Sequence, residues 1–142
     1  MAPRASRSVT AVTLDSNIYV SALQFGGVSA RLLGMARMGT IRIDTSDAIL
    51  TETVGVLRDK FDWSGYRLHF ARLELQKLAN IVEPTQTFKV VDDPDDDKIL
   101  ECAVEAGSDF IVTQDKGLLR LGSFQGMGIL RPLEFLDRQP MR

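Results

Sequence analysis

The chain contains few of the residues that would point to disulfides, membrane spans or a strongly charged partner. Its 142 residues include one cysteine, Cys102, which excludes an internal disulfide and indicates a reducing compartment. Cys102 lies in a predicted apolar helical stripe, so we interpret it as a buried, inert thiol. The net charge is only −2, so a nucleic-acid partner would require a local basic patch or a bridging cation.

Long apolar runs are also absent from the sequence. The apolar stretch VTAVTL ends at Asp15 after six residues, which is too short for the core of a signal peptide. No run approaches the length of a membrane span, so we expect a cytoplasmic protein. We expect residues 1–8 to form a flexible tail. The single histidine, His69, and the single tryptophan, Trp63, are far in sequence from the acidic residues discussed below, and we assign neither a catalytic role.

What the sequence does contain is an alternation of strand-like and helix-like segments. This alternation predicts an α/β fold with a mostly parallel sheet, in one domain over residues 9–138. Strands are predicted at 9–14, 41–43, 110–113 and 127–130, with a short extended piece at 81–82. Helices are predicted at 28–38, 64–80, 94–106 and 116–120. A further helix is predicted to begin at residue 46, and a final helical turn at residue 132.

Two acidic residues come at the ends of predicted strands. Asp15 directly follows the first strand, and Asp115 follows the strand at 110–113. In parallel α/β sheets, ligands bind beyond the carboxyl ends of the strands, where the strand order switches. We therefore expect these two side chains to converge at one edge of the sheet. Each could instead cap the helix that follows it.

Five aspartates occur within residues 92–97. Asp93 before Pro94 is typical of a helix start, and Asp95 and Asp96 would then lie in a first turn that favours acids. Asp97 differs because it lies within about 20° of Val104 on the helix, at the border of the apolar stripe. We therefore select Asp97 as the functional acid of this run.

A calcium loop starting at Asp93 would match the EF-hand pattern at its first three acidic positions. It fails where that pattern requires glycine and glutamate, since Lys98 and Val104 stand there. Glu52 resembles Asp97 in its placement, with Ile49 and Val56 on the same helix face. A solvated glutamate is the alternative interpretation of Glu52.

In combination these segments resemble the PIN-domain nucleases, and in particular bacterial toxins of toxin–antitoxin pairs. The resemblance covers nearly the whole predicted domain. The matching segments are VTLDSNIYVSAL at 12–23, SDAILTETVGVL at 46–57, DDPDDDKILECAVEAGSDFIVTQDKGLL at 92–119 and GILRPLEFL at 128–136.

The resemblance implies a three-layer α/β/α sandwich and RNA cleavage that depends on Mg²⁺ or Mn²⁺. It implies that four acids are catalytic and bind the metal: Asp15, Glu52, Asp97 and Asp115. It also implies that Asn17 and Thr113 support these acids. A cognate antitoxin protein and a homodimer are the partners that such toxins commonly have. Many relatives carry a further acid where this chain has Lys116 and Gly117, so this chain departs from the family pattern at that position.

An RNA substrate also needs cations around the acidic site. Four residues lie after strand ends or on adjoining helices, and we consider them as possible RNA-binding residues alongside the alternative of ordinary surface charge. They are Arg31, Arg37, Lys116 and Arg120.

Two other functions compete with the nuclease: an Asp-dependent phosphoryl-transfer domain, and a PIN fold that serves only as a binding or scaffold module. An Asp-dependent phosphoryl-transfer domain of the haloacid-dehalogenase type would need a second aspartate at position 17, where this chain has Asn17. A receiver domain would carry its acidic pair near the start and its phospho-acceptor in mid-chain, which is the reverse of the order here. A PIN fold used only as a binding or scaffold module would be expected to have lost one of the four acids, and none is lost.

Overall fold

In the computed structural model, which describes residues 9–139, the chain folds around one sheet with the strand order β3-β2-β1-β4-β6-β5. All neighbouring strands are parallel except β5 and β6. The strands are β1 (Thr10–Leu14), β2 (Ile41–Thr45), β3 (Asn80–Ile81), β4 (Phe110–Val112), β5 (Ser123–Phe124) and β6 (Met127–Leu130). The expected flexible tail, residues 1–8, lies outside the described residues.

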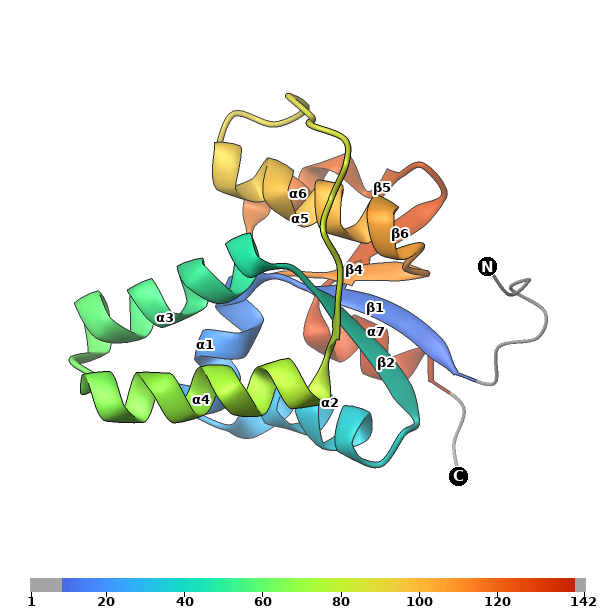
Figure 1. Cartoon of the computed structure of the whole chain (residues 1–142). Coiled ribbons are helices and arrows are strands. Elements are labelled where there is room, and N and C mark those ends of the chain that lie inside the picture. The colour runs from blue at the N-terminus through green and yellow to red at the C-terminus, as the bar shows by residue number, and fades with distance from the viewer. Residues whose placement is uncertain (1–8, 140–142) are drawn as a thin grey trace.

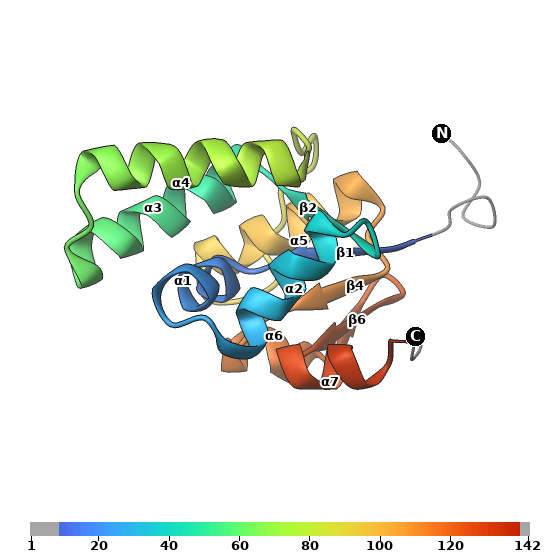
Figure 2. The ribbon, with the colours of Figure 1, turned by 90° about the horizontal axis from the view of Figure 1, so that it is seen from below.

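Helices cover both faces of this sheet. The helices are α1 (Ser16–Gln24), α2 (Gly27–Arg37), α3 (Asp47–Phe61), α4 (Gly65–Leu78), α5 (Pro94–Ala106), α6 (Lys116–Leu121) and α7 (Pro132–Asp137). In Figure 1, α5 and α6 lie above the sheet and α1, α2 and α7 lie below it. Figure 2 shows α3 and α4 as an antiparallel pair beside these layers. The three-layer α/β/α sandwich with a mostly parallel sheet is therefore confirmed.

The sheet is buried on both faces, as its continuous apolar strands predict. Ala11, Val12 and Leu14 of β1 are fully buried, as are Ile111 and Val112 of the neighbouring β4. Parallel strands covered by helices on both sides lose the alternation of apolar and polar residues. The central strands thus form the middle of one hydrophobic core.

The strand order reverses next to β1. The chain passes from β1 to β2 and β3 on one side, and then returns through α5 to β4 on the other side. The backbone N–H of Asp15 donates to the carbonyl of Val112 over 2.9 Å, so the ends of β1 and β4 lie at the same level. The sheet therefore has its switch point where Asp15 and Asp115 were expected to converge.

Helix α5 begins as the acidic run predicts. The carboxylate of Asp93 accepts a hydrogen bond from the N–H of Asp95 over 2.9 Å, and Pro94 is the first helical residue. The predicted helix 94–106 is confirmed, and Gly107 ends it with a positive φ of 66°. Ser46 and Ser64 cap α3 and α4 in the same way.

Two elements were not predicted from the sequence. Helix α1 buries Ile18, Tyr19, Val20 and Ala22 together, so its sequence lacks the one-sided periodicity of a surface helix. Strand β5 has only two residues and pairs with β6 across a tight turn that contains Gly126. Such short pieces depend on tertiary contacts rather than on a local pattern.

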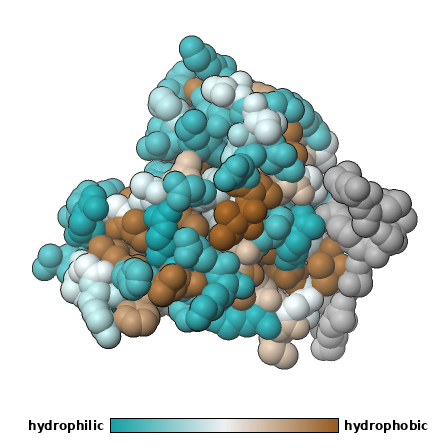
Figure 3. Space-filling model, in the orientation of Figure 1, coloured by the Kyte–Doolittle hydropathy of each residue, from teal (hydrophilic) through white to brown (hydrophobic). Residues whose placement is uncertain are grey.

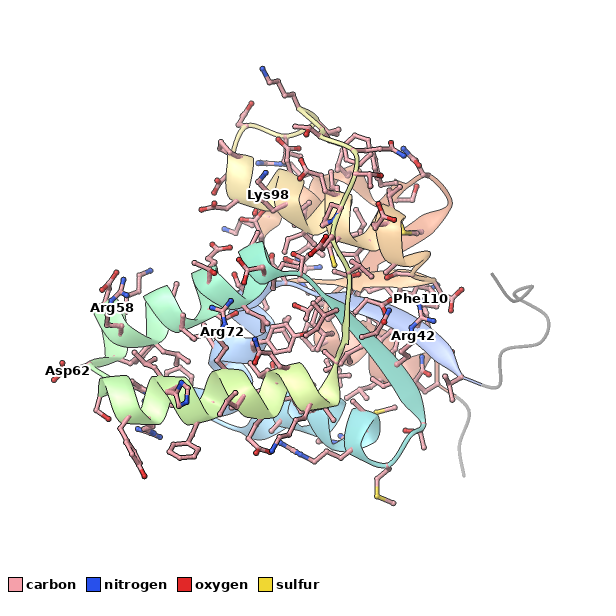
Figure 4. All side chains as sticks on the ribbon, in the orientation of Figure 1. Arg42, Arg58, Asp62, Arg72, Lys98 and Phe110 are labelled. Atoms are coloured by element: carbon pink, nitrogen blue, oxygen red, sulfur yellow. The ribbon has the colours of Figure 1, made fainter. Side chains whose placement is uncertain are left out.

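A buried polar cluster fixes the sheet to the turn that follows α5. Asp44 is fully buried and accepts hydrogen bonds from Arg42, Asn80 and Ser108, over 2.8 Å from Arg42 Nε and 2.7 Å from Ser108 Oγ. Figure 4 labels Arg42 on β2. Cys102 is buried nearby, and burial raises the pKa of its thiol to about 12, which confirms an inert thiol.

Outside the core, Trp63 is buried between α1 and α4 and donates from its indole N–H to Gln24 over 2.7 Å. His69 is exposed on α4. Among the described residues, no helix combines the length and the apolar character needed to cross a membrane.

Candidate active site

Asp15 occupies the cap position of α1, but its side chain makes no capping hydrogen bond. Its Oδ2 instead accepts hydrogen bonds from the Thr113 hydroxyl over 2.7 Å and from Asn17 Nδ2 over 3.3 Å, and its Oδ1 accepts one from Ser16 over 3.2 Å. The residue is only 4% exposed. Burial raises the pKa of the Asp15 carboxyl, and these hydrogen bonds partly offset the rise. The capping explanation therefore fails for Asp15.

Asp115 combines both roles that the sequence left open. Its Oδ2 accepts a hydrogen bond from the N–H of Leu118 over 2.9 Å, so it caps α6. Its own N–H donates to the Thr113 hydroxyl over 2.9 Å. Thr113 therefore links the two strand-end acids directly. Asn17 completes the link, because its Oδ1 accepts a hydrogen bond from Gln114 N over 3.3 Å.

The structure places Asp97, the acid selected from the sequence, apart from Asp15 and Asp115. Its side chain is 5% exposed, and its Oδ1 accepts hydrogen bonds from the backbone N–H groups of Val90 over 2.9 Å and Val91 over 3.2 Å. From its position at the border of the apolar stripe, the Asp97 side chain therefore faces the segment before α5. It does not face the other acids. Asp96, the next residue toward the helix start, faces them instead.

The carboxyl groups of Asp96 and Asp115 interact, and the protonated form of Asp96 can donate a hydrogen bond to Asp115. Partial burial and this contact raise the pKa of Asp96 to about 8, and the charges of Asp115, Asp15 and Asp93 add to the rise. Two carboxylates at this separation cannot both ionise without a nearby positive charge.

Glu52 reaches the same place from α3. Burial raises the pKa of its carboxyl, and the negative charge of Asp95 raises it further, while the nearby Ser16 hydroxyl lowers it. Asp15 and Asp93 also contribute to the rise. Glu52 is thus part of the acidic group rather than a solvated helix residue.

A cavity of about 530 Å³ joins these acids. Five carboxyl side chains line it, namely Asp15, Glu52, Asp93, Asp96 and Asp115, and the one basic residue in its lining is Lys60. Within residues 9–139, no ion pair joins any of the five to a lysine or arginine. The cavity therefore concentrates negative charge with no cationic partner in contact.

The candidate RNA-binding residues divide into two groups. Lys116 and Arg120 line a second hollow that shares Asp93, Asp96 and Asp115 with the acidic cavity. Arg37 lines a separate hollow between α2 and α4, and Arg31 is exposed on α2 and lines neither acidic hollow. The structure therefore brings Lys116 and Arg120 to the acids but does not bring Arg31 and Arg37 there.

The side chains of the cavity fit a hard divalent cation. Carboxylate and hydroxyl oxygens are the ligands that Mg²⁺ and Mn²⁺ prefer, and Mg²⁺ keeps several waters, so two or three carboxylates are sufficient. In the part of the chain that the structure describes, no three acidic, imidazole or thiol groups already converge at the separation of metal ligands. A cation bound beside Asp96 and Asp115 would relieve the repulsion that raises the pKa of Asp96.

Several cavity residues were missed by the sequence analysis: Ser16, Phe25, Lys60, Phe61, Asp93 and Asp96. For the two aspartates a signal was present. Asp93 is the cap of α5, and Asp96 follows it by three residues, so both lie on one face of the first turn. Ser16, Lys60 and the two phenylalanines carry no local signal, since their place depends on how α1 packs against α3.

Comparison with known proteins agrees with this geometry. A family model described as PIN domain matches residues 11–117, a range that contains all five cavity acids. A search among curated proteins finds no match.

Two solved structures share the fold. One is VapBC2 from Rickettsia felis bound to a DNA fragment from their promoter, with a TM-score of 0.60, 14% identity, and coverage of 84% of this chain and 97% of that chain. The other is VapBC-1 from nontypeable Haemophilus influenzae, with a TM-score of 0.60, 14% identity, and coverage of 87% of this chain and 99% of that chain. Because the family match spans most of the sequence, this chain belongs to the PIN domain family.

Proposed function

We propose that this protein is a metal-dependent endoribonuclease that hydrolyses RNA phosphodiester bonds in the cytoplasm. The observation that carries the proposal is the acidic cavity, in which carboxylates that follow β1 and β4 meet those of α3 and of the start of α5 without an ion-paired cation. Such a site favours a divalent ion and, through that ion, a phosphate group.

Asp15, Asp96 and Asp115 would hold the ion, with Asp96 taking the role that the sequence assigned to Asp97. Asn17 and Thr113 keep Asp15 in one orientation, because both donate hydrogen bonds to its Oδ2. Thr113 also holds the backbone of Asp115. Fixed carboxylates of this kind need little reorganisation when the substrate binds.

The chemistry supplied by Mg²⁺ or Mn²⁺, when bound, is neutralisation of phosphate oxygens and a lower pKa for water. Glu52 lines the cavity from α3 and orients the attacking water, whose proton its carboxylate accepts. The raised pKa of Glu52 makes its carboxylate a stronger proton acceptor than an ordinary glutamate. Lys116 and Arg120, beside Asp96 and Asp115, hold the flanking RNA backbone.

The direct test incubates the full-length protein with RNA and Mg²⁺ or Mn²⁺, with EDTA as one control and Asp15→Asn as another. We expect cleavage with either ion, none with EDTA, and none with the variant. Cleavage that continues unchanged with Asp15→Asn would overturn the proposal. RNA binding without cleavage in any divalent ion would instead favour a PIN fold that serves only as a binding module.

We further propose that the protein is the toxin of a toxin–antitoxin pair, held inactive by its antitoxin, and that it forms a homodimer. The shared fold with two VapBC structures supports this proposal. A second support is α4, which exposes Tyr66, Phe70 and Leu73. Figure 3 shows hydrophobic side chains reaching the surface between hydrophilic ones over this part of the molecule.

Helix α4 is held against α3, so its exposed residues face outward. Arg72 reaches from α4 to pair with Asp47 at the start of α3, and it also donates to Thr51 over 3.3 Å. Figure 4 shows Arg72 between the two helices.

Co-expression with the product of the adjacent gene tests the antitoxin. We expect a stable complex that no longer cleaves RNA, and the double variant Tyr66→Ala/Phe70→Ala should weaken this complex. A neighbouring gene product that neither binds nor inhibits would contradict the pairing. Light scattering of the isolated protein measures the oligomeric state.

A further inference from the structure

The acidic cavity has a second, aromatic end. Phe25 follows the last residue of α1 and is 72% exposed, and Phe61 is the last residue of α3. Their rings pack edge to face with centroids 5.6 Å apart and an interplanar angle of 85°. Both rings line the same cavity as the five acids.

The cavity is a trough between two neighbouring helices. Helices α1 and α3 pack against each other, and both lie on the left of Figure 2. The trough is lined from α1 by Asn17, Ser21 and Phe25, and from α3 by Glu52, Val56 and Lys60. Residues four apart share one face of a helix, so each helix turns one continuous face to the trough.

The two ends of the trough differ in chemistry. Asp15 precedes α1 and Phe25 follows it, so the acids and the rings are about 15 Å apart along the helix at 1.5 Å per residue. Lys60, next to Phe61, adds a positive charge at the aromatic end. One end of the trough is acidic, and the other end is aromatic and carries a positive charge. This combination suits a nucleotide, with its phosphate and its base, better than a purely apolar ligand.

Building on the proposed nuclease function, we propose that the Phe25–Phe61 pair is a base-stacking subsite. It takes a nucleobase close to the cleaved phosphodiester of single-stranded RNA, and Lys60 neutralises the phosphate beside that base. Aromatic side chains bind single-stranded nucleic acids by stacking on exposed bases. The bases of a duplex are already paired and stacked on one another, so this subsite requires an unpaired base.

The exposed face of Phe25 suits this role. Phe25 projects between the acidic cavity and another hollow, which it lines together with Ser21, Gln114 and Arg131. The trough therefore continues past Phe25 toward a further positive charge. An extended strand can follow this path, with its backbone contacting cations on either side of the stacked base.

Binding measurements test the subsite without cleavage. In an Asp96→Asn background, fluorescence anisotropy gives the Kd of a labelled single-stranded RNA and of the same RNA with one abasic position at a time. We expect Phe25→Ala to weaken binding of the intact RNA by about 5- to 150-fold, the usual range for loss of one base stack. Phe25→Trp should retain the affinity, and Met38→Ala, which truncates an exposed apolar residue outside the trough, should not change it.

The abasic series identifies the base. One abasic position should weaken binding to the Asp96→Asn parent as much as Phe25→Ala does, and Phe25→Ala should cause no further loss with that RNA. Equal losses on intact and on every abasic RNA would overturn the proposal, as would wild-type affinity for Phe25→Ala or equal binding of duplex RNA. A Phe25→Ala variant that loses only the antitoxin would assign the rings to a protein partner instead.

These outcomes are separable from the nuclease proposal. If the otherwise unaltered protein cleaves RNA and Phe25→Ala leaves both kcat and KM unchanged, the stacking subsite is wrong and the nuclease stands. If base-dependent binding is found but no RNA is cleaved, the nuclease proposal fails and the subsite stands.

Discussion

The carboxylate of Asp97 accepts a hydrogen bond from the backbone N–H of Val90, seven residues earlier, over 2.9 Å. A second bond from Val91 N to the same oxygen closes the loop before α5. Asp97 therefore holds the chain that leads into the helix, while its neighbour Asp96 is left free to face the other acids.

Substitution of these two neighbours should have opposite effects. Asp96→Asn should lower kcat by about 100-fold or more, because it removes a carboxylate that would hold the metal. Asp97→Asn should retain cleavage within a few-fold but lower the free energy of unfolding by about 1–2 kcal/mol, since it loses a charge-assisted hydrogen bond. Steady-state kinetics and urea denaturation of both variants provide the comparison. Equal loss of cleavage in the two variants would remove this distinction.

The stability of the metal-free protein should fall as the pH rises. The pKa of Asp96 is about 8 in the folded protein and has an ordinary value of 3.8, so between these values the folded state holds a proton that the unfolded state has released. The resulting stabilisation is full below about pH 4 and is lost as the pH rises through about 8. Denaturation in EDTA from pH 5 to 9 should show this slope.

Asp96→Asn should flatten that slope, and Asp137→Asn, which removes a charge far from the cavity, should not. In the protein without substitutions, added Mg²⁺ should release a proton on binding and should bind more tightly as the pH rises toward 8, which calorimetry in buffers of different ionisation enthalpy measures. An unchanged slope in Asp96→Asn would show that this proton lies elsewhere.

Thr113→Val should weaken the site while leaving the fold intact. The substitution removes the hydroxyl that donates to Asp15 and accepts from the Asp115 backbone. Loss of such a supporting group commonly lowers metal affinity or activity by about 10- to 100-fold. Thr113→Ser keeps the hydroxyl and serves as the matched control, which should recover most of the activity. Titration of cleavage against Mn²⁺ concentration checks both variants.

Gly117→Ala should disturb Asp115. A Cβ at this position would lie 3.0 Å from Asp115 Oδ2, so the Asp115 carboxylate must shift, while its distance of 3.7 Å from Asp96 Oδ2 is an ordinary contact. A displacement of this kind should reduce kcat by about 10-fold or more. Gly34→Ala, in an α2 position with no atom within 4 Å of the added Cβ, is the control and should keep full activity with equal or higher stability. Full activity in Gly117→Ala would show that the pair has room to adjust.

The alternation of strands and helices predicted the sheet and the approach of Asp15 to Asp115, because the carboxyl ends of parallel strands share one edge. The choice between Asp96 and Asp97 could not be made in the same way. The apolar stripe of α5 faces the core, but at the first turn of the helix Asp97 on its border meets the backbone of Val90 and Val91, and the cavity lies on the adjacent face. The position of Glu52 near the acids was predicted through the family resemblance. Lys60 and Phe61 could not be placed, since their position depends on how α1 packs against α3.

The trough between α1 and α3 carries the acids at one end and the two phenylalanine rings at the other. The acids belong to the sheet edge and to helix starts, where small movements disturb the hydrogen bonds that orient them. The rings lie at helix ends, where Phe25 is exposed at the surface and Phe61 packs against the buried cluster of Val20, Leu57 and Trp63. Under the proposed function, substitutions at position 25 should therefore change which RNA binds without moving the acids, which would make this position a starting point for altering substrate choice.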